Sequence, residues 1–168
     1  LVSRGLGDVY KRQQIDDAEK NYRKAILLDS RHIGSYNNLA LIYQNKGRIE
    51  EGLNIIKKVL KFETSNAAIN HSNGIMSLQL GRLRDGWEYN EYRWKTSPLN
   101  KVIWPFEGKP VWKGEKGKRV VLWKEQGIGD QIIFLSLVPE VKSMCDTLSV
   151  YVDPRLQNLC RRAMPEIK

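Results

Sequence analysis

The sequence predicts an array of helical repeats followed by the beginning of a parallel α/β domain. Two observations predict this order. A short glycine-containing pattern recurs after 34 residues in the first half of the chain, and a period of that length is typical of stacked helical pairs. The second half carries two short β-branched runs, each followed by a segment with helical character, and this alternation is typical of a parallel sheet.

The repeated pattern is Gly-Arg-aliphatic-X-X-Gly, which stands at 47–52 and again at 81–86. Apolar residues at helical spacing lie on both sides of each copy, and a glycine between them suits the end of a helix. The offset indicates two complete units, at about 33–66 and 67–97, and the second half of an earlier unit, at about 14–32. We therefore expect about 2.5 helical repeats over residues 14–97.

These units resemble the tetratricopeptide repeat (TPR), a pair of helices with an aromatic residue early in the first helix and small residues where the helices cross. Tyr36 and Ala40 stand at such positions. The resemblance weakens in the last unit, where Asn70, Asn73 and Ser77 replace large apolar residues. We therefore expect a terminal unit with a more hydrated face.

The TPR resemblance implies a protein or peptide partner bound along the first helices of the units. The residues expected to line this groove are Asn37, Asn38, Leu41, Asn45, His71 and Ile75. TPR arrays that clamp a carboxylate use Lys and Arg at such positions, and none stands here, so we do not expect acidic C-terminal peptides as ligands in this groove. No Cys/His cluster accompanies the histidines, and we expect no metal site.

Residues 1–13 do not fit the first helix of a repeat, because Gly5 and Gly7 fall where that helix should run. The string resembles a translated sequencing-adapter artefact, and we expect it to be a non-native leader. The formal net charge of the chain is +9, and it falls to +7 without this segment, which holds three basic residues and one acidic residue.

The composition argues against several other classes of protein. Lys and Arg are scattered without a block of five like charges, so we expect a solvated basic surface and no nucleic-acid partner. No run approaches the roughly 18 apolar residues of a membrane-spanning helix. Two cysteines, Cys145 and Cys160, are too few and too isolated for a disulfide scaffold. We expect a cytoplasmic location, with peripheral association at the inner membrane as an alternative.

Residues 98–118 form a connector rich in proline and large aromatic residues. Pro98, Pro105 and Pro110 exclude a regular helix there. Two interpretations are open for the aromatic residues: a platform on which a sugar stacks, or packing between two domains. We favour packing, since large aromatic side chains dominate the energetics of cores.

The remaining segments, 119–168, predict a β-α-β-α order. We expect strands at 119–124 and 147–152, a loop at 125–130, and helices from 131 to about 144 and from 156 to 164. This order is typical of a Rossmann-like parallel sheet with a right-handed crossover. A nicotinamide cofactor is not expected, because Ile132 stands where the dinucleotide-binding pattern requires a third small residue.

The segment from Leu122 to Pro139, with its Gly129-Asp130 pair, resembles the opening of the heptosyltransferase-like glycosyltransferases (glycosyltransferase family 9). The preceding stretch from Phe106 to Glu115 looks like that of bacterial TPR proteins fused to such a domain. The resemblance implies inverting sugar transfer from a nucleotide-sugar donor, with no other cofactor, to a glycan, a lipid-linked or a protein acceptor. It also implies that this chain is a fragment holding only the first part of the acceptor lobe, inactive by itself.

Residue roles follow from the same resemblance. The aspartate of the Gly-Asp pair is the proposed general base of the family, and it corresponds to Asp130; Gly127 and Gly129 would shape the loop and Gln126 would line the acceptor site. A carboxylate at a helix N-terminus stays ionised, as a base requires. Asp130 as a plain helix cap and Gln126 as a surface residue are the alternatives.

Two other functions stay open at this point. The first is a non-enzymatic TPR scaffold with a degenerate α/β domain. The second is a protein that resembles the TPR-bearing O-linked N-acetylglucosamine transferases, which modify protein hydroxyls.

Overall fold

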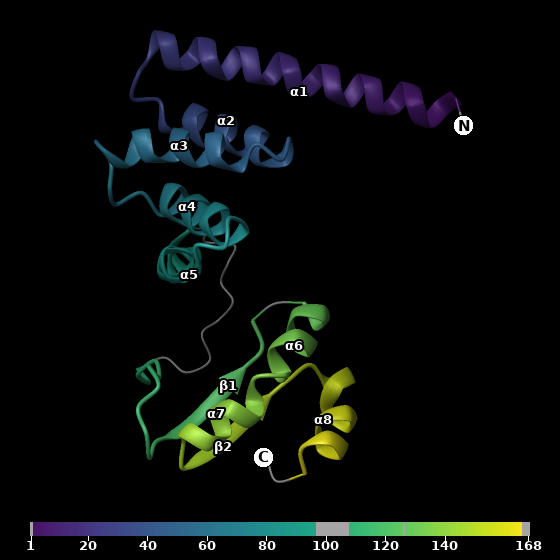
Figure 1. The fold of residues 1–168 in the computed structure, drawn as a ribbon, viewed down its shortest axis with the longest axis vertical. Coiled ribbons are helices and arrows are strands. Elements are labelled where there is room, and N and C mark those ends of the chain that lie inside the picture. Colours follow the sequence, from purple (N-terminus) through teal and green to yellow (C-terminus); the bar gives the residue numbers. More distant parts are fainter. Residues whose placement is uncertain (1, 97–107, 126, 166–168) are drawn as a thin grey trace. The chain divides into compact units, whose positions relative to one another are not determined.

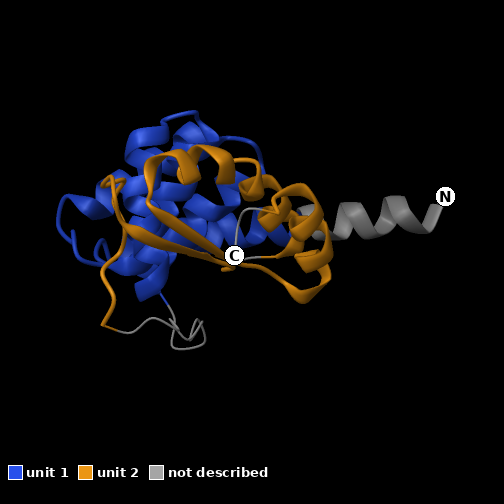
Figure 2. Cartoon of the chain, turned by 90° about the horizontal axis from the view of Figure 1, so that it is seen from below, with its two compact units in different colours: residues 1–101 blue, residues 102–168 orange. Residues whose placement is uncertain are grey.

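The computed structural model describes residues 2–96, 108–125 and 127–165, and among these the side chains from residue 13 onward. The chain forms two compact units, residues 1–101 and 102–168 (Figure 2). The first unit is helical in its described part, and the second contains a parallel sheet.

The first unit is built of successive helices (Figure 1). They are α1 (Val2–Leu28), α2 (Ile33–Asn45), α3 (Ile49–Leu60), α4 (Ala67–Gln79), α5 (Leu83–Asn90) and the short 3-10 helix η1 (Glu91–Lys95). The two predicted hairpins, α2 with α3 and α4 with α5, are confirmed. The helix α1 runs without a break through residue 13, where the sequence suggested a boundary.

The same turn joins the helices in both hairpins. Gly47 and Gly81 each adopt a φ of 73°, a left-handed conformation that favours glycine. The following arginine closes each turn: the amide of Arg48 donates to the carbonyl of Tyr43 at 2.8 Å, and the amide of Arg82 donates to that of Ser77 at 2.9 Å. The repeated glycine in the sequence therefore reports a repeated helix C-terminus.

A single apolar core holds the two hairpins together. Its fully buried members lie at helical spacing on α2, α3 and α4, and they are Ala40, Leu53, Ile56, Val59, Ile69 and Met76. Each of these side chains except that of Ala40 contributes roughly 1.5–3 kcal/mol relative to an exposed one. The period of apolar residues therefore decides which face of each helix packs inward.

The prediction of a hydrated face on the last unit is wrong. Asn70, Asn73 and Ser77 are exposed by only 2%, 4% and 3%. The side-chain amide of Asn70 donates to the carbonyls of Thr64 at 2.8 Å and Asn66 at 2.9 Å, so it fixes the turn that leads into α4. The Oδ1 atom of Asn73 is buried without a hydrogen bond to any part of the chain that the structure describes.

These polar residues are buried because α4 and α5 approach each other very closely at two glycines. A Cβ atom on Gly74 would lie 2.6 Å from the backbone nitrogen of Asn90 and 3.0 Å from the carbonyl oxygen of Gly86. A Cβ atom on Gly86 would in turn lie 2.7 Å from the side chain of Leu78. The glycines thus allow backbone-to-backbone packing that buries this face of α4.

The second unit contains two parallel strands and helices that follow them (Figure 1). Its elements are β1 (Arg119–Trp123), α6 (Ile128–Leu135), α7 (Val138–Met144), β2 (Thr147–Tyr151), the 3-10 helix η2 (Pro154–Leu156) and α8 (Gln157–Ala163). The strands pair from Arg119 opposite Thr147 to Trp123 opposite Tyr151. Val120, Leu148 and Val138 of α7 form the core, which lies on one face of the sheet.

The predicted single helix at 131–144 is wrong in two respects. The helix begins earlier, at Ile128, inside the expected loop, and it ends at Leu135. A second helix starts at Val138, with Pro139 in its first turn. A proline has no amide hydrogen and its ring clashes with the preceding helical turn, so it is accepted at the start of α7 but not inside a continuous helix.

The described part of the connector belongs to the second unit. Trp112 packs against the core of the sheet, and its indole Nε1 donates to the carbonyl of Glu115 at 2.9 Å. This aromatic residue therefore serves as packing within one unit. Residues 97–107, which include Trp104, lie outside the described residues.

Candidate functional site

The face formed by the first helices of the two hairpins, α2 and α4, carries the predicted groove residues. Asn38, Leu41 and Asn45 are exposed along α2. Asn37 of α2 and both His71 and Ile75 of α4 are half-buried. We call this surface the first-helix face; it combines amide groups with two aliphatic side chains, which suits contacts with a peptide backbone and its apolar side chains.

Two hydrogen bonds connect α2 to α4 across this face. The hydroxyl of Ser72 donates to Oδ1 of Asn37 at 2.8 Å, and Nε2 of Gln44 donates to Oε1 of Gln79 at 2.8 Å. Both contacts join residues that are 35 apart in the chain, one more than the repeat length, on the first helices of the two hairpins. The bond to Ser72 holds Asn37 in a fixed orientation, so the exposed ligand groups of the face are chiefly those of Asn38, Leu41 and Asn45.

His71 has an altered acidity. Burial lowers the pKa of His71 from its ordinary value of 6.5, the positive charge of Arg93 lowers it further, and a hydrogen bond with Asn90 partly opposes these effects. A neutral imidazole offers both a donor and an acceptor. His71 therefore adds a neutral polar group to the first-helix face near pH 7.

A second set of polar residues lies at the carboxyl end of the two strands. The amide of Lys124 donates to the carbonyl of Tyr151 at 3.0 Å, and Nζ of Lys124 lies 3.9 Å from Oδ2 of Asp153. The side chain of Gln131 accepts from the amide of Asp153 at 2.9 Å. Ligands of open parallel sheets bind outside this edge.

Asp153 is held in its charged form. Its Oδ1 atom accepts hydrogen bonds from the side chain of Arg155 at 2.9 Å and from the amide of Arg155 at 3.0 Å. These two bonds lower the pKa of Asp153 to about 2. The carboxylate caps the start of η2, so its hydrogen bonds serve the local structure of the chain.

Asp130, the predicted base, lies in the first turn of α6 and is exposed. It is not the helix cap, which is Gly127, so the alternative of a plain cap is wrong. A Cβ atom on Gly127 would lie 3.5 Å from Oδ2 of Asp130, and nothing described lies within 4 Å of such an atom on Gly129. The carboxylate thus lies back toward an open, glycine-lined loop. The substrate role of Gln126 is a prediction that lies outside the described residues.

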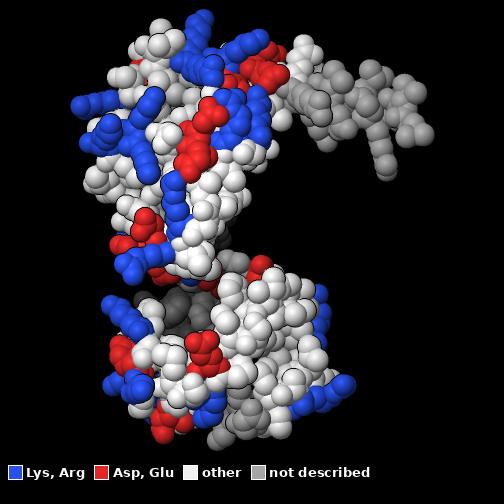
Figure 3. Space-filling model, viewed as in Figure 1, with Lys and Arg blue, Asp and Glu red and all other residues white. Residues whose placement is uncertain are grey.

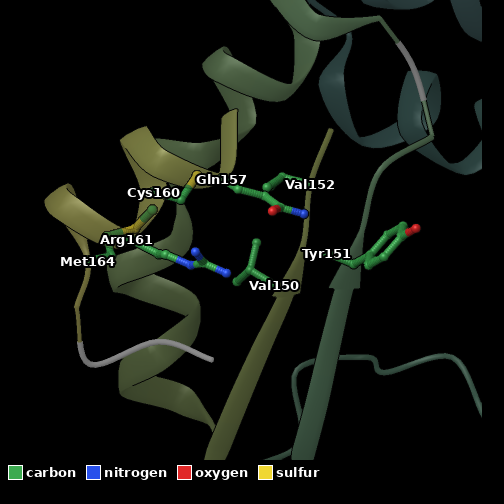
Figure 4. Close-up of a pocket in the computed structure, with 7 residues that line it drawn as sticks. All are labelled: Val150, Tyr151, Val152, Gln157, Cys160, Arg161 and Met164. Atoms are coloured by element: carbon green, nitrogen blue, oxygen red, sulfur yellow. The ribbon is translucent and has the colours of Figure 1, made fainter. Parts of the chain in front are cut away.

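The sequence did not indicate the hollow between β2 and α8, which has a volume of about 340 Å³ (Figure 4). Val150, Val152 and Met164 supply apolar walls, while the side chain of Arg161 points toward Val150 and that of Gln157 toward Val152. The hollow follows the edge of β2 that β1 does not occupy. No sequence signal distinguishes such an edge from a paired one.

The described residues contain neither a cluster of metal-ligating side chains nor a helix that could span a membrane. No group of three or more His, Cys, Asp or Glu side chains is placed to hold a metal ion among them. None of their helices combines the length and the apolar character needed to cross a membrane.

Comparison with known proteins identifies one repeat directly. The model of the tetratricopeptide repeat matches residues 33–66, which comprise α2, α3 and the turn into α4. The chain therefore contains a TPR, and this supports a role in protein–protein interaction. The match begins at residue 33, where the 34-residue period places the start of the first complete unit.

One curated relative aligns with both units. Protein FlbA of Caulobacter vibrioides is 28% identical over 142 residues, which cover 80% of this chain and 24% of FlbA. The chain thus spans about a quarter of the length of the curated relative that it matches. The similarity supports a bacterial, TPR-containing protein.

Proposed function

We propose that the helical unit binds a peptide segment of a partner protein on the first-helix face, with Asn38, Leu41 and Asn45 as its principal contacts. The supporting observation is that these three side chains are exposed in a row on α2 although the same helix buries its opposite side in the core. His71 and Ile75 extend the contact surface onto α4. Asn37 contributes through its bond to Ser72, which ties the two helices together.

A selection from a displayed random peptide library on the immobilised chain tests this function. Selected peptides should bind with micromolar or better affinity in fluorescence polarisation, and Leu41→Arg should weaken them by about tenfold or more, since it removes an apolar contact and introduces an unpaired charge. Lys109→Glu, an exposed site in the second unit, is the matched control. If Leu41→Arg binds every selected peptide as well as the parent does, the first-helix face is not the binding surface.

We further propose that the second unit is the first part of a Rossmann-like glycosyltransferase lobe that receives the acceptor of a sugar transfer. Support comes from the parallel pairing of β1 with β2 and from the place of Asp130, in the first turn of the helix that follows β1. In this proposal the Asp130 carboxylate takes the proton of the acceptor hydroxyl as that oxygen attacks the anomeric carbon of a nucleotide-sugar, with Gly127 and Gly129 leaving space for the substrate.

Turnover by a longer protein that contains this chain tests the enzymatic proposal. Release of nucleoside diphosphate from a panel of UDP-, GDP- and ADP-sugars should depend on Asp130, and Asp130→Asn should lower kcat by roughly 10²-fold or more if the residue is the base. Asp146→Asn, another exposed carboxylate in the second unit, is the control. Unchanged turnover in Asp130→Asn would remove this residue from the mechanism, and no turnover of any donor by the parent would favour the non-enzymatic scaffold.

A further inference from the structure

A groove on the other side of the helical unit offers a second binding surface. It lies between α1 and α3 over a floor provided by α2, and its volume is about 550 Å³. Ile26 and Leu27 of α1, Tyr36 and Leu39 of α2, and Ile55 and Lys58 of α3 are among its lining residues. We call it the outer groove. It shares no residue with the predicted first-helix set.

Exposed apolar side chains lie in the outer groove, which Leu27 lines, and beside it. Leu27 is 86% exposed and its neighbour Leu28 is 81% exposed, although both belong to a regular helix. Phe62, which contacts the ring of Tyr36 at a centroid distance of 6.5 Å, is 41% exposed at the end of α3. Burying a leucine side chain contributes roughly 1.5–3 kcal/mol, so this end of the groove favours an apolar occupant.

Lysine side chains lie on both helices that border the groove, and one of them, Lys58, lines it. Lys20 and Lys24 lie on α1, and Lys57, Lys58 and Lys61 lie on α3 or directly after it; all five side chains are exposed. Figure 3 shows Lys and Arg side chains gathered over these two helices, at the upper left of the helical unit.

The acidic side chains of these helices that the structure describes form ion pairs within the chain, and one of them, Glu51, itself lines the groove. Asp16 and Glu19 both pair with Lys46 at 2.7 Å, and Glu51 pairs with Arg48 at 2.6 Å. Among the described residues, no acid forms an ion pair with Lys24, Lys57, Lys58 or Lys61. The groove therefore combines an apolar floor with one lining cation, Lys58, that is unpaired in the described part of the chain, and its two other charged lining residues, Arg23 and Glu51, are already paired within the chain. Lys24, Lys57 and Lys61 add positive charge on or directly after the same helices.

From this combination we infer that the outer groove binds an acidic amphipathic segment of a partner protein, with Leu or Phe side chains on the floor and carboxylates facing the lysines. A groove between two helices accepts the apolar face of a third helix, which presents side chains at i, i+3 and i+4. Complementary charge on the two flanks fixes the orientation of such a segment and speeds its association. The inference is independent of the proposed peptide site on the first-helix face, since the two sites share no residue and use different faces of α2.

The probe for the experiment is a fluorescein-labelled amphipathic peptide of about four helical turns, with Leu and Phe on one face and Glu on the other. Its binding to the full chain is measured by fluorescence polarisation. We expect Lys58→Glu to weaken binding by about 5- to 10-fold and Leu27→Ser by about fivefold, and replacement of Glu by Gln in the peptide to cost about tenfold. Since both substituted side chains are exposed, the thermal unfolding curve should stay unchanged.

Matched controls separate the groove from general surface effects. Lys116→Glu and Leu83→Ser change the same residue types at exposed sites on the second unit and on α5, and they should bind as the parent does. Leu41→Arg, on the first-helix face, should likewise leave this probe unaffected. Loss of probe binding in Leu41→Arg but not in Lys58→Glu would overturn the inference and assign the probe to the first-helix face.

Other occupants of the groove give different results. Phosphatidylserine vesicles that bind the parent more tightly than the peptide does, with the same sensitivity to Lys58→Glu, would replace the protein segment by a lipid surface. A dimer in light scattering that Leu27→Ser dissociates would replace it by a second copy of the chain. Equal binding of the Glu and Gln peptides would also overturn the inference, because the lysines would then have no part in recognition.

Discussion

The close approach of α4 and α5 makes Gly74 the residue at which a single methyl group should do most damage. In Gly74→Ala the new Cβ would meet three backbone atoms, the nitrogen of Asn90 at 2.6 Å, the carbonyl carbon of Tyr89 at 2.9 Å and the oxygen of Gly86 at 3.0 Å. Backbone atoms cannot move aside as a side chain does, so the two helices must separate. Overpacking of this kind costs about 1–3 kcal/mol, and here we expect the upper end of that range.

Helix propensity acts in the opposite direction. Alanine is favoured over glycine inside a helix by about 1 kcal/mol, which leaves a net destabilisation of about 2 kcal/mol for Gly74→Ala. With a urea dependence of about 1–2 kcal/mol per molar for a unit of this size, the midpoint of unfolding should fall by roughly 1–2 M. Far-UV circular dichroism follows this transition, because the described helices lie mostly in the first unit.

Gly34→Ala provides the matched control. Gly34 also lies in a helix, α2, but a Cβ there would only touch the ring of His32 at 3.6 Å, an ordinary contact. We expect this variant to gain about 0.5–1 kcal/mol. If Gly74→Ala unfolds at the same urea concentration as the parent, or at a higher one, the helices do not pack as closely as described and the argument fails.

Two further predictions concern titrating groups. Arg155→Gln should raise the pKa of Asp153 from about 2 toward its ordinary value of 3.8. A carbon NMR titration of the carboxyl group measures this pKa. In the parent, the stabilising contribution of this carboxylate is present above pH 3.8 and is lost as the pH falls through about 2. No change of this pKa in the variant would show that the arginine is not its cause. His71, whose pKa is lowered from 6.5, should reduce the stability of the folded chain as the pH falls below 6.5, because the unfolded chain then binds a proton that the folded chain does not. His71→Gln should flatten the difference between urea midpoints at pH 7 and pH 5.5, and an equal slope in both proteins would contradict this.

The helical unit was the easier part to predict from the sequence. A glycine at the same place in two hairpins, Gly47 and Gly81, marks a turn that glycine adopts readily, and the apolar stripes between these turns leave one choice of buried face. The exposure of Asn38, Leu41 and Asn45 follows from the same geometry, since they lie away from that stripe. Whether they bind a partner remains a prediction.

The errors arose where tertiary packing decides the outcome. The burial of Asn73 depends on the proximity of α5, which no periodicity in α4 reveals. The outer groove depends on the spacing of two helices. Its nearest sequence signal is the adjacent pair Leu27 and Leu28, because a helix that buries only one face would bury at most one of them. The break before α7, in contrast, was predictable from Pro139, because a proline favours the first turn of a new helix over the middle of an old one.

Because the turns at Gly47 and Gly81 match, they bear on how the helical array can lengthen or shorten during evolution. The two joints have the same glycine conformation and equivalent hydrogen bonds, so residues 47–80 can be excised, or copied, with the chain rejoined at an equivalent point. The shortened chain would place α5 directly after α2, where Ala40 would face Gly86 as it now faces Gly52. Recombination between the gene segments that encode these two turns would thus insert or delete a whole structural module. The array can gain or lose reach toward a partner in steps of one unit without a new joint having to evolve.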